Sequence, residues 1–343
     1  MKKLIIIVFA LMFTLSNLNA QVDKSTTKVA TTAAQFLKIG VGARPIAMGG
    51  AYSAMQGDIN SSYWNPAGIS RIYGGEATFN HANWLADIKY DFFAATYDIP
   101  GLGTLGATIV SYNVPEEIVR TYKNPEGDGR VFDAGAISIG LVYAQNLTDR
   151  FSIGISTKVI REWIWNESAM GLAVDIGTLY ITPFNDLKIG ASISNFGTKM
   201  QLEGRDLEFL ENMQTITDDG TINNIRSVYE AERYEMPLTF RVGLAMDVIK
   251  YDNILRATAA VDAVHPNDNS EYLNLGLEFA YDEMFFIRGG YKTLFMKDAE
   301  GGLTVGGGIS CHIGGASYLK IDYALADYNR LKQVHFISLS MKY

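Results

Sequence analysis

This chain has little cysteine, little histidine and too little positive charge for several classes of function. Its 343 residues include one cysteine, Cys311, so no internal disulfide can form and stability must come from packing or from a membrane. The single cysteine and the 4 histidines form no cluster at the spacing of metal ligands. Lys and Arg total 29 against 37 for Asp and Glu, which gives a net charge of -8. That charge argues against nucleic acid as a partner, because phosphate binding needs a basic face.

Catalytic patterns are also scarce. His312 follows Ser310 on one face of a predicted strand, but nothing at a suitable spacing supplies a third partner or an oxyanion site. The glycine clusters at 301–302 and 306–308 lack the strand-to-helix context of a phosphate loop. We therefore expect no enzyme, no catalytic residue, no cofactor and no metal site.

Long hydrophobic runs are missing after residue 20. No later segment approaches the roughly 18 apolar residues that a transmembrane helix requires, so none is expected. The first 20 residues differ, because Lys2 and Lys3 precede an apolar run that ends at Leu15, and Ala20 provides a small residue for cleavage. Residues 1–20 are therefore predicted to be a secretory signal peptide, and the mature protein is expected to be exported.

An alternating pattern of apolar and polar residues dominates the chain from residue 73 to residue 343. Turn signals divide this region into about 14 segments, which we predict to be antiparallel strands. The segments cover residues 76–83, 89–98, 104–113, 133–145, 151–163, 168–182, 187–195, 237–248, 254–264, 271–281, 284–293, 303–313, 317–325 and 334–343. Alternation alone does not decide the fold, because a soluble β-sandwich produces the same pattern with inside and outside exchanged.

Three features favour a transmembrane barrel in the outer membrane. The segments have roughly the 9–12 residues that a tilted strand needs to cross a bilayer. Their polar faces are rich in Gly, Ala and Ser, which suits a crowded lumen better than a solvated surface. The last strand has an apolar face that resembles the signal by which outer-membrane proteins are inserted; its members are Ile337, Leu339, Met341 and Tyr343. We therefore predict an all-β barrel whose outer surface contacts outer-membrane lipid.

Two connections between the predicted strands are long. They cover residues 114–131 and 197–235, and both are rich in charged residues. In bacterial barrels the periplasmic turns are short and the external loops are long. Both connections are therefore predicted to lie outside the cell.

Residues 21–72 do not follow the strand pattern. The spacing of Val29, Ala33, Phe36 and Leu37 predicts a helix, and the segment Asn65-Pro-Ala-Gly68 fits a type I turn. This region is therefore predicted to form short helices and turns. The residues alone leave two roles open, a cap on one end of the fold or a plug inside a pore.

The same region carries a resemblance to a known family. The segments Ala33-Ala-Gln-Phe-Leu-Lys-Ile-Gly-Val-Gly-Ala-Arg-Pro-Ile-Ala-Met-Gly-Gly-Ala-Tyr52 and Tyr63-Trp-Asn-Pro-Ala-Gly68, followed by the strands, resemble the PorV/PorQ family. That family is related in fold to the FadL-type outer-membrane transporters of hydrophobic compounds. The resemblance implies that residues 21–72 form a hatch folded inside the barrel. The residues expected to hold this hatch are Arg44, Gly49, Gly50, Asp58, Trp64, Asn65, Pro66 and Gly68.

Charged residues of both signs fall on the predicted lumen face. They are Lys158, Asp175, Arg241, Asp247, Glu278, Arg288, Lys320 and Asp322. Because buried charges must be paired, we predict that these residues pair with one another and with Arg44 and Asp58 of the hatch.

Two functions follow from the resemblance. PorV-type members serve type IX protein secretion, where they bind the C-terminal signal domains of cargo and associate with the outer-membrane translocon. The first expectation is therefore a non-enzymatic component of that system. The alternative is a FadL-like transporter for hydrophobic small molecules, which would need an apolar pocket near Phe36, Leu37, Met48 and Tyr52.

Overall fold

The computed structural model describes residues 28–212, 224–252, 254–296, 299–315 and 317–343. The predicted signal peptide and the first residues of the predicted N-terminal region lie outside this part of the chain. No helix among the described residues is long and apolar enough to cross a bilayer.

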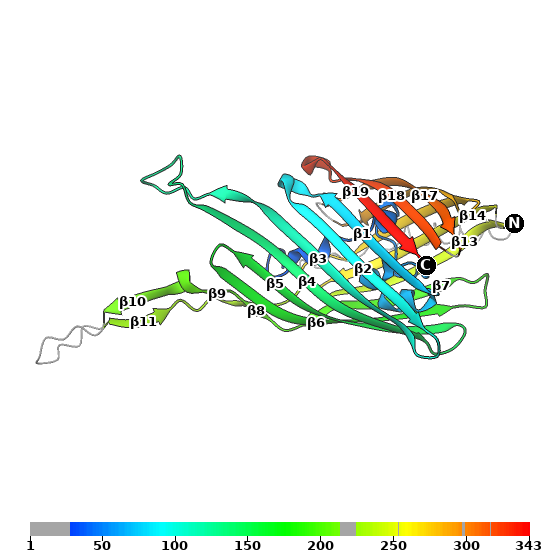
Figure 1. The fold of residues 1–343 in the computed structure, drawn as a ribbon, viewed down its shortest axis with the longest axis horizontal. Coiled ribbons are helices and arrows are strands. Elements are labelled where there is room, and N and C mark those ends of the chain that lie inside the picture. The colour runs from blue at the N-terminus through cyan, green and yellow to red at the C-terminus, as the bar shows by residue number, and fades with distance from the viewer. Residues whose placement is uncertain (1–27, 213–223, 253, 297–298, 316) are drawn as a thin grey trace, which may run out of the picture.

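Fourteen antiparallel strands form a closed barrel, which confirms the predicted fold class (Figure 1). Each strand pairs with the next barrel strand along the chain, and β1 pairs with β19 to close the ring. The strands are β1 (Gly75–Asn83), β2 (Lys89–Ile99), β3 (Gly103–Ile118), β4 (Val131–Asn146), β5 (Phe151–Ile164), β6 (Glu167–Ile181), β7 (Lys188–Gly197), β13 (Thr239–Tyr251), β14 (Leu255–Pro266), β15 (Tyr272–Tyr281), β16 (Phe285–Leu294), β17 (Leu303–Gly314), β18 (Ser317–Asp327) and β19 (Gln333–Lys342). Closure leaves no free sheet edge in the barrel wall.

The alternation along the strands separates an apolar outer face from a small or polar inner face. On β4, Ile139 and Leu141 are exposed on the outside, whereas Ser138 and Val142 are buried inside. The predicted insertion signal lies on the outer face of the last strand, where Ile337, Leu339, Met341 and Tyr343 are all exposed. Its role in membrane insertion stays a prediction.

The barrel has short turns at one end and longer connections at the other. The end with the longer connections is called the external end here, because long loops face outward in bacterial barrels. The first long connection is shorter than predicted. Strand β3 continues through Pro115 to Ile118, with a register shift between Val114 and Glu117. A proline is tolerated at such an irregularity because the ladder hydrogen bond is already lost there.

The described residues of the second long connection, 198–212 and 224–238, form a projecting structure that we call the external arm. Figure 1 shows it extending well beyond the end of the barrel. It contains β8 (Met200–Gln201), β9 (Glu203–Gly204), η4 (Arg205–Leu207), β10 (Glu208–Asn212), β11 (Asn224–Val228) and β12 (Arg233–Tyr234). Strand β10 pairs with β11 and β8 with β12, while β9 adds to β6 of the barrel wall. Two short helices, η3 (Leu85–Asp87) and η5 (Asn329–Leu331), complete the external connections.

The described part of the N-terminal region, residues 28–72, is called the hatch. Figure 1 shows its blue ribbon inside the barrel. It consists of η1 (Gln35–Lys38), α2 (Ala43–Ala47), α3 (Ser61–Trp64) and η2 (Pro66–Arg71). Nearly every residue from Ile39 to Ile72 is buried.

The helix predicted from Val29 onward is wrong in extent. Only one turn of 3-10 helix, η1, forms in this segment. Ala34 has a left-handed backbone with φ 52°, and Thr32 makes a parallel bridge with Glu235 of the external arm. Contacts with the barrel loops therefore override the local helical spacing, as tertiary context often does for a weak propensity.

Candidate functional site

A buried ion network joins the hatch to the barrel wall. Arg44 donates from Nε and Nη2 to the two carboxylate oxygens of Glu278 at 2.8 and 2.7 Å. Its Nη1 donates to Asp58 at 2.9 Å. The two parallel hydrogen bonds to Glu278 on β15 fix the orientation of the Arg44 guanidinium and strengthen the ion pair. Arg44 therefore connects one carboxylate of the hatch with one of the wall.

The network continues along the wall. Arg288 donates to Glu278 and to Asp322 at 2.6 Å each, and Arg256 donates to Glu278 at 3.0 Å. Lys320 lies 3.8 Å from Asp58 and 3.9 Å from Asp322. The structure thus brings together Arg44, Asp58, Glu278, Arg288, Lys320 and Asp322, as the sequence predicted.

The remaining predicted lumen charges make separate contacts. Lys158 donates to Asp175 at 2.9 Å and to Asn195 at 2.6 Å, which forms a local cluster on the wall. Arg241 donates to Ser194 at 3.1 Å, and its guanidinium lies 5.6 Å from the centre of the Trp64 ring in the hatch. Asp247 accepts a hydrogen bond from the Thr258 hydroxyl. Of these residues, Arg241 contacts the hatch, and it does so through an aromatic face.

The charge on Asp58 persists into strong acid. Burial alone would raise the pKa of its carboxyl, but the nearby cations of Arg44 and Lys320 outweigh burial and lower the pKa to about 2. A carboxyl with a depressed pKa stabilises the fold fully above its ordinary pKa and loses that contribution progressively as the pH falls from the ordinary to the depressed value. The contribution of Asp58 to holding the hatch is therefore complete at neutral pH and is lost as the pH falls from the ordinary pKa of 3.8 to about 2.

Three wall and loop carboxylates that hold the hatch were missed by the sequence reasoning, and one of them, Glu162 on β5, accepts a hydrogen bond from the backbone of Ala34 at 3.0 Å. Asp262 accepts hydrogen bonds from the backbone of Tyr52 at 3.0 Å and from the backbone and hydroxyl of Ser53 at 2.9 and 2.6 Å. Its place between Val261 and Ala263 in the alternating pattern could have identified it as a lumen residue.

Asp268, in the loop after β14, was the third omission. It accepts hydrogen bonds from Thr32, Gln35 and Lys38, each at 2.8 Å. Burial would raise the pKa of this carboxyl, but these hydrogen bonds and the charge of Lys38 hold it below its ordinary value. No periodic pattern marks a residue within a loop, so this contact could not be predicted from the sequence.

The Asn65-Pro66 step fixes the periplasmic half of the hatch. The Asn65 amide donates to the carbonyl oxygens of Ser53 at 2.6 Å and of Thr178 on β6 at 3.0 Å. Its own oxygen accepts from the backbone of Ala67 and caps η2, with Pro66 at the first helical position. The predicted turn is therefore the first turn of a 3-10 helix, anchored to the wall by its cap.

The other predicted hatch residues make tight backbone contacts. Gly49 has φ 66° and donates its backbone N–H to Thr304 on β17 at 3.0 Å, and Gly50 has φ 75°. Such left-handed conformations favour glycine. Trp64 donates its ring N–H to the Val41 carbonyl at 3.0 Å. A side chain at Gly68 would overlap Ser61, so this glycine permits α3 and η2 to pack together.

Glycines of the wall face the hatch backbone. A Cβ at Gly177 would overlap Asn65, and one at Gly190 would overlap Ser53. The other wall glycines in contact with the hatch backbone or its short side chains are Gly154, Gly243, Gly276, Gly290 and Gly306. The glycine-rich inner face predicted from the sequence therefore serves close approach between wall and hatch.

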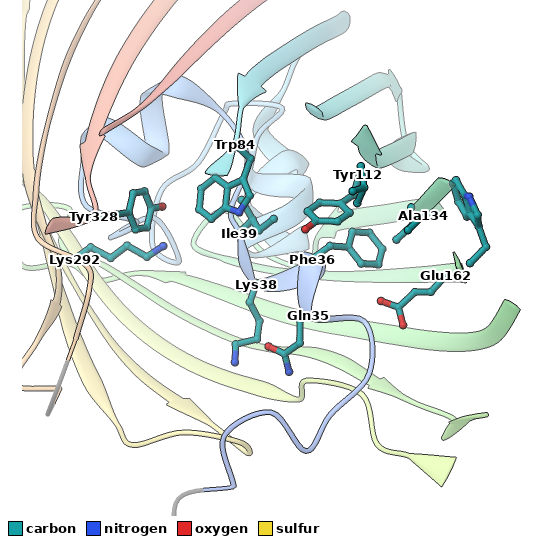
Figure 2. Close-up of a pocket in the computed structure, with 14 residues that line it drawn as sticks. Gln35, Phe36, Lys38, Ile39, Trp84, Tyr112, Ala134, Glu162, Lys292 and Tyr328 are labelled. Atoms are coloured by element: carbon teal, nitrogen blue, oxygen red, sulfur yellow. The ribbon is translucent and has the colours of Figure 1, made fainter. Parts of the chain in front are cut away.

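A cavity of about 540 Å³ lies on the external side of the hatch (Figure 2). Its lining is largely aromatic and aliphatic, with Phe36 and Ile39 from η1 and its C-cap on one side and Trp84, Tyr112 and Tyr328 from the barrel on the other. Gln35, Lys38, Glu162 and Lys292 supply the polar groups that Figure 2 labels. This size and lining are typical of sites for small apolar ligands.

The cavity differs from the pocket that the sequence predicted. Only Phe36 of the four expected residues lines it. Leu37, Met48 and Tyr52 are buried in the packing between hatch and wall. The backbone of Tyr52 bonds to Asp262, and the Met48 backbone lies against Gly276 and Gly290, so these two residues pack against the wall and do not line the cavity.

No protein-family model and no curated protein sequence matches the chain. Solved structures do match its fold. The toluene transporter TodX of Pseudomonas putida aligns with a TM-score of 0.55 at 14% identity, over 88% of this chain and 97% of that one. The toluene transporter TbuX of Ralstonia pickettii gives 0.53 at 14% identity over 88% and 97%. A FadL homologue of Pseudomonas aeruginosa gives 0.50 at 12% identity over 86% and 96%. At these identities the likeness establishes a FadL-like outer-membrane barrel fold and no finer property.

Proposed function

We propose that this protein is a FadL-like outer-membrane transporter that takes a hydrophobic small molecule from outside into the cavity above the hatch. The observation that carries the proposal is the cavity itself, about 540 Å³ in volume and lined mainly by aromatic and aliphatic side chains. Burial of apolar ligand surface there would supply binding energy of about 25 cal/mol per Å² before the costs of association. The solved structures of similar fold include two described as toluene transporters, which is compatible with an apolar ligand.

The hatch supports the same proposal as the floor of the binding site. The cavity is bounded by η1, and the rest of the hatch fills the lumen behind it. A ligand bound there would be separated from the periplasm by the ion network and by the packing of wall glycines on the hatch. Passage would then require the hatch to shift, and binding and passage become two separable steps.

Filling the cavity should weaken ligand binding without changing the barrel. Ala134 lines the cavity from β4, and an Ala134→Trp variant would place an indole in the ligand space. We expect at least about tenfold weaker binding of naphthalene to the detergent-solubilised protein, measured by calorimetry, because one well-placed side chain in a small pocket removes more than about 1.4 kcal/mol.

The matched control is Ile139→Trp on the same strand. Ile139 points outward and is exposed, so its replacement leaves the cavity unchanged. Equal naphthalene binding by wild type and both variants would show that the cavity is not the site, and the proposed function would then lose its main support.

The external arm favours a second candidate, in which the protein binds cargo or the translocon in type IX secretion as a PorV/PorQ member. The arm exposes Leu210, Val228 and Tyr229, and the Phe209 and Tyr229 rings stack at 4.3 Å. A groove of about 500 Å³ lies among its residues. Exposed apolar groups gathered on a projecting hairpin are a feature of protein-binding surfaces.

Truncating the arm tests this second candidate. Glu208 and Val228 are paired across β10 and β11, so replacing residues 209–227 with two glycines closes the hairpin by a short turn. If the outer part of the arm recruits secreted proteins, affinity purification from solubilised outer membranes should recover a translocon or cargo with the full chain and lose it with the truncated one. Retention of the same partners by the truncated chain would refute a docking role for residues 209–227 and would leave the groove at the base of the arm as the docking surface. Unchanged naphthalene binding by the truncated chain would show that the arm and the cavity act independently.

A further inference from the structure

We propose that the carboxylate of Glu162 makes the cavity selective for apolar molecules that carry a hydroxyl group; this inference rests on the proposed function and specifies its ligand. Glu162 lies near the external end of β5 and lines the cavity. Its side chain is half-buried, and Figure 2 shows it extending from the wall toward Phe36. The cavity therefore contains a strong hydrogen-bond acceptor within a largely aromatic and aliphatic lining.

Only one oxygen of the Glu162 carboxylate is used by the protein. Its Oε2 accepts the backbone N–H of Ala34 at 3.0 Å. Among the residues that the structure describes, its Oε1 has no hydrogen-bond donor and the carboxylate makes no ion pair. Oε1 is also not enclosed by protein atoms, so it is open to a molecule in the cavity. Holding the hatch therefore accounts for one half of this carboxylate and leaves the other half for a ligand.

The two lysines of the lining are engaged elsewhere. The Lys38 ammonium contacts both oxygens of Asp268 at 2.8 Å, and the Lys292 ammonium lies 5.7 Å from the centre of the Tyr328 ring. A carboxylate partly removed from water is stabilised by any donor that replaces the lost water. A ligand hydroxyl at Oε1 would be such a donor, and a hydrogen bond to an ionised acceptor is roughly twice as strong as a neutral one.

Apolar side chains beside the carboxylate would hold the body of such a ligand. The rings of Phe36 and Tyr112 both line the cavity with their centroids 6.2 Å apart, and Ala134 and Ala136 line the wall near them. A pure hydrocarbon bound there would displace water from Oε1 and offer no donor in its place. A site that leaves an acceptor unpaired in this way discriminates against such a ligand. The matching ligand is therefore a phenol or an alcohol with an apolar body.

A pair of probes tests the inference. 1-Naphthol and 1-methoxynaphthalene carry an oxygen at the same ring position, but only naphthol can donate a hydrogen bond. The ether oxygen can still accept from other donors of the lining, so the comparison isolates donation to Glu162. Calorimetry on the detergent-solubilised full chain, with blank titrations into the same detergent, should give about tenfold tighter binding of naphthol, as expected for one hydrogen bond to a charged group.

A Glu162→Gln variant should remove this preference while the hatch stays in place. The amide oxygen can keep the hydrogen bond from Ala34, and the amide NH2 group, which only donates, then takes the place of Oε1. Naphthol and methoxynaphthalene should therefore bind about equally. The matched control is Glu167→Gln. Glu167 on β6 likewise accepts a backbone N–H, from Asp206 at 2.9 Å, but it does not line the cavity, so this variant should keep the preference.

Each other outcome has a definite meaning. Equal binding of naphthol and methoxynaphthalene by the wild type, an undiminished preference in Glu162→Gln, or a preference lost in both variants overturns the role of Glu162. If naphthalene still binds in those cases, the proposed function stands without this inference. Failure of all three compounds to bind the wild type overturns both. Folding of each variant is checked by its shift in electrophoretic mobility on heating.

Discussion

Replacing Glu278 with alanine should loosen the hatch from the barrel wall and allow small ions to pass through the barrel. Glu278 accepts from Arg44 of the hatch and from Arg256 and Arg288 of the wall, and its side chain is fully buried. Its removal would leave three guanidinium groups close together with too little negative charge. Breaking a buried ion pair by deleting one partner costs ~3–5 kcal/mol, and we expect the destabilisation to appear as a clear rise in planar-bilayer conductance.

Glu283 offers a matched control for this experiment. It also accepts from Arg256, at 2.7 Å, but it is exposed in the turn between β15 and β16. Exposed ion pairs contribute about 0–1 kcal/mol, so Glu283→Ala should keep the wild-type conductance. If the Glu278→Ala and Glu283→Ala barrels showed the same low conductance, the ion network could not be what holds the hatch in place.

The barrel could be predicted from the sequence because its wall repeats one simple rule. Strand length and alternation located every barrel strand, and the disagreements concern a few residues at strand ends, such as the continuation of β3 through Pro115. The charges of the ion network were found for the same reason. Glu278, Arg288 and Asp322 interrupt the small or apolar inner faces of their strands, and charges in such positions must find partners.

The cavity could not be predicted because its lining combines strands that lie far apart in the sequence with hatch and loop segments that have no period. Ile39 comes from the hatch, Trp84 and Tyr328 from external connections, and Lys292 from a strand. Nothing in their spacing relates them, and the closure of the barrel brings them together. Asp268 is similar, because its partners Thr32 and Lys38 lie more than two hundred residues earlier in the chain. Local sequence patterns predict the strands of the wall, whereas the contacts and the cavity inside the lumen depend on segments that are distant in the sequence and meet only in the folded barrel.

Substitutions at two neighbouring glycines on β16 can test whether the hatch needs wall positions without side chains. Gly290 faces inward, where a Cβ would overlap the backbone of Met48 and Gly49. Gly289 faces outward, and the nearest atom to a Cβ there is the Thr304 oxygen at 4.0 Å. The two residues share a strand and a local backbone, so they differ mainly in what their side chains would meet.

Gly290→Val should therefore displace the hatch, while Gly289→Val should be neutral. Overpacking typically costs about 1–3 kcal/mol, and the cost rises where the opposing atoms are backbone and cannot rotate away. We expect Gly290→Val to give either a marked loss of heat-resistant folded barrel from the outer membrane or a barrel with raised conductance. A valine at Gly289 adds a β-branched side chain to a lipid-facing strand, which favours strand structure. If both variants folded and remained closed alike, the hatch would not lie against β16 as described, and the cavity bounded by η1 would have to be reconsidered with it.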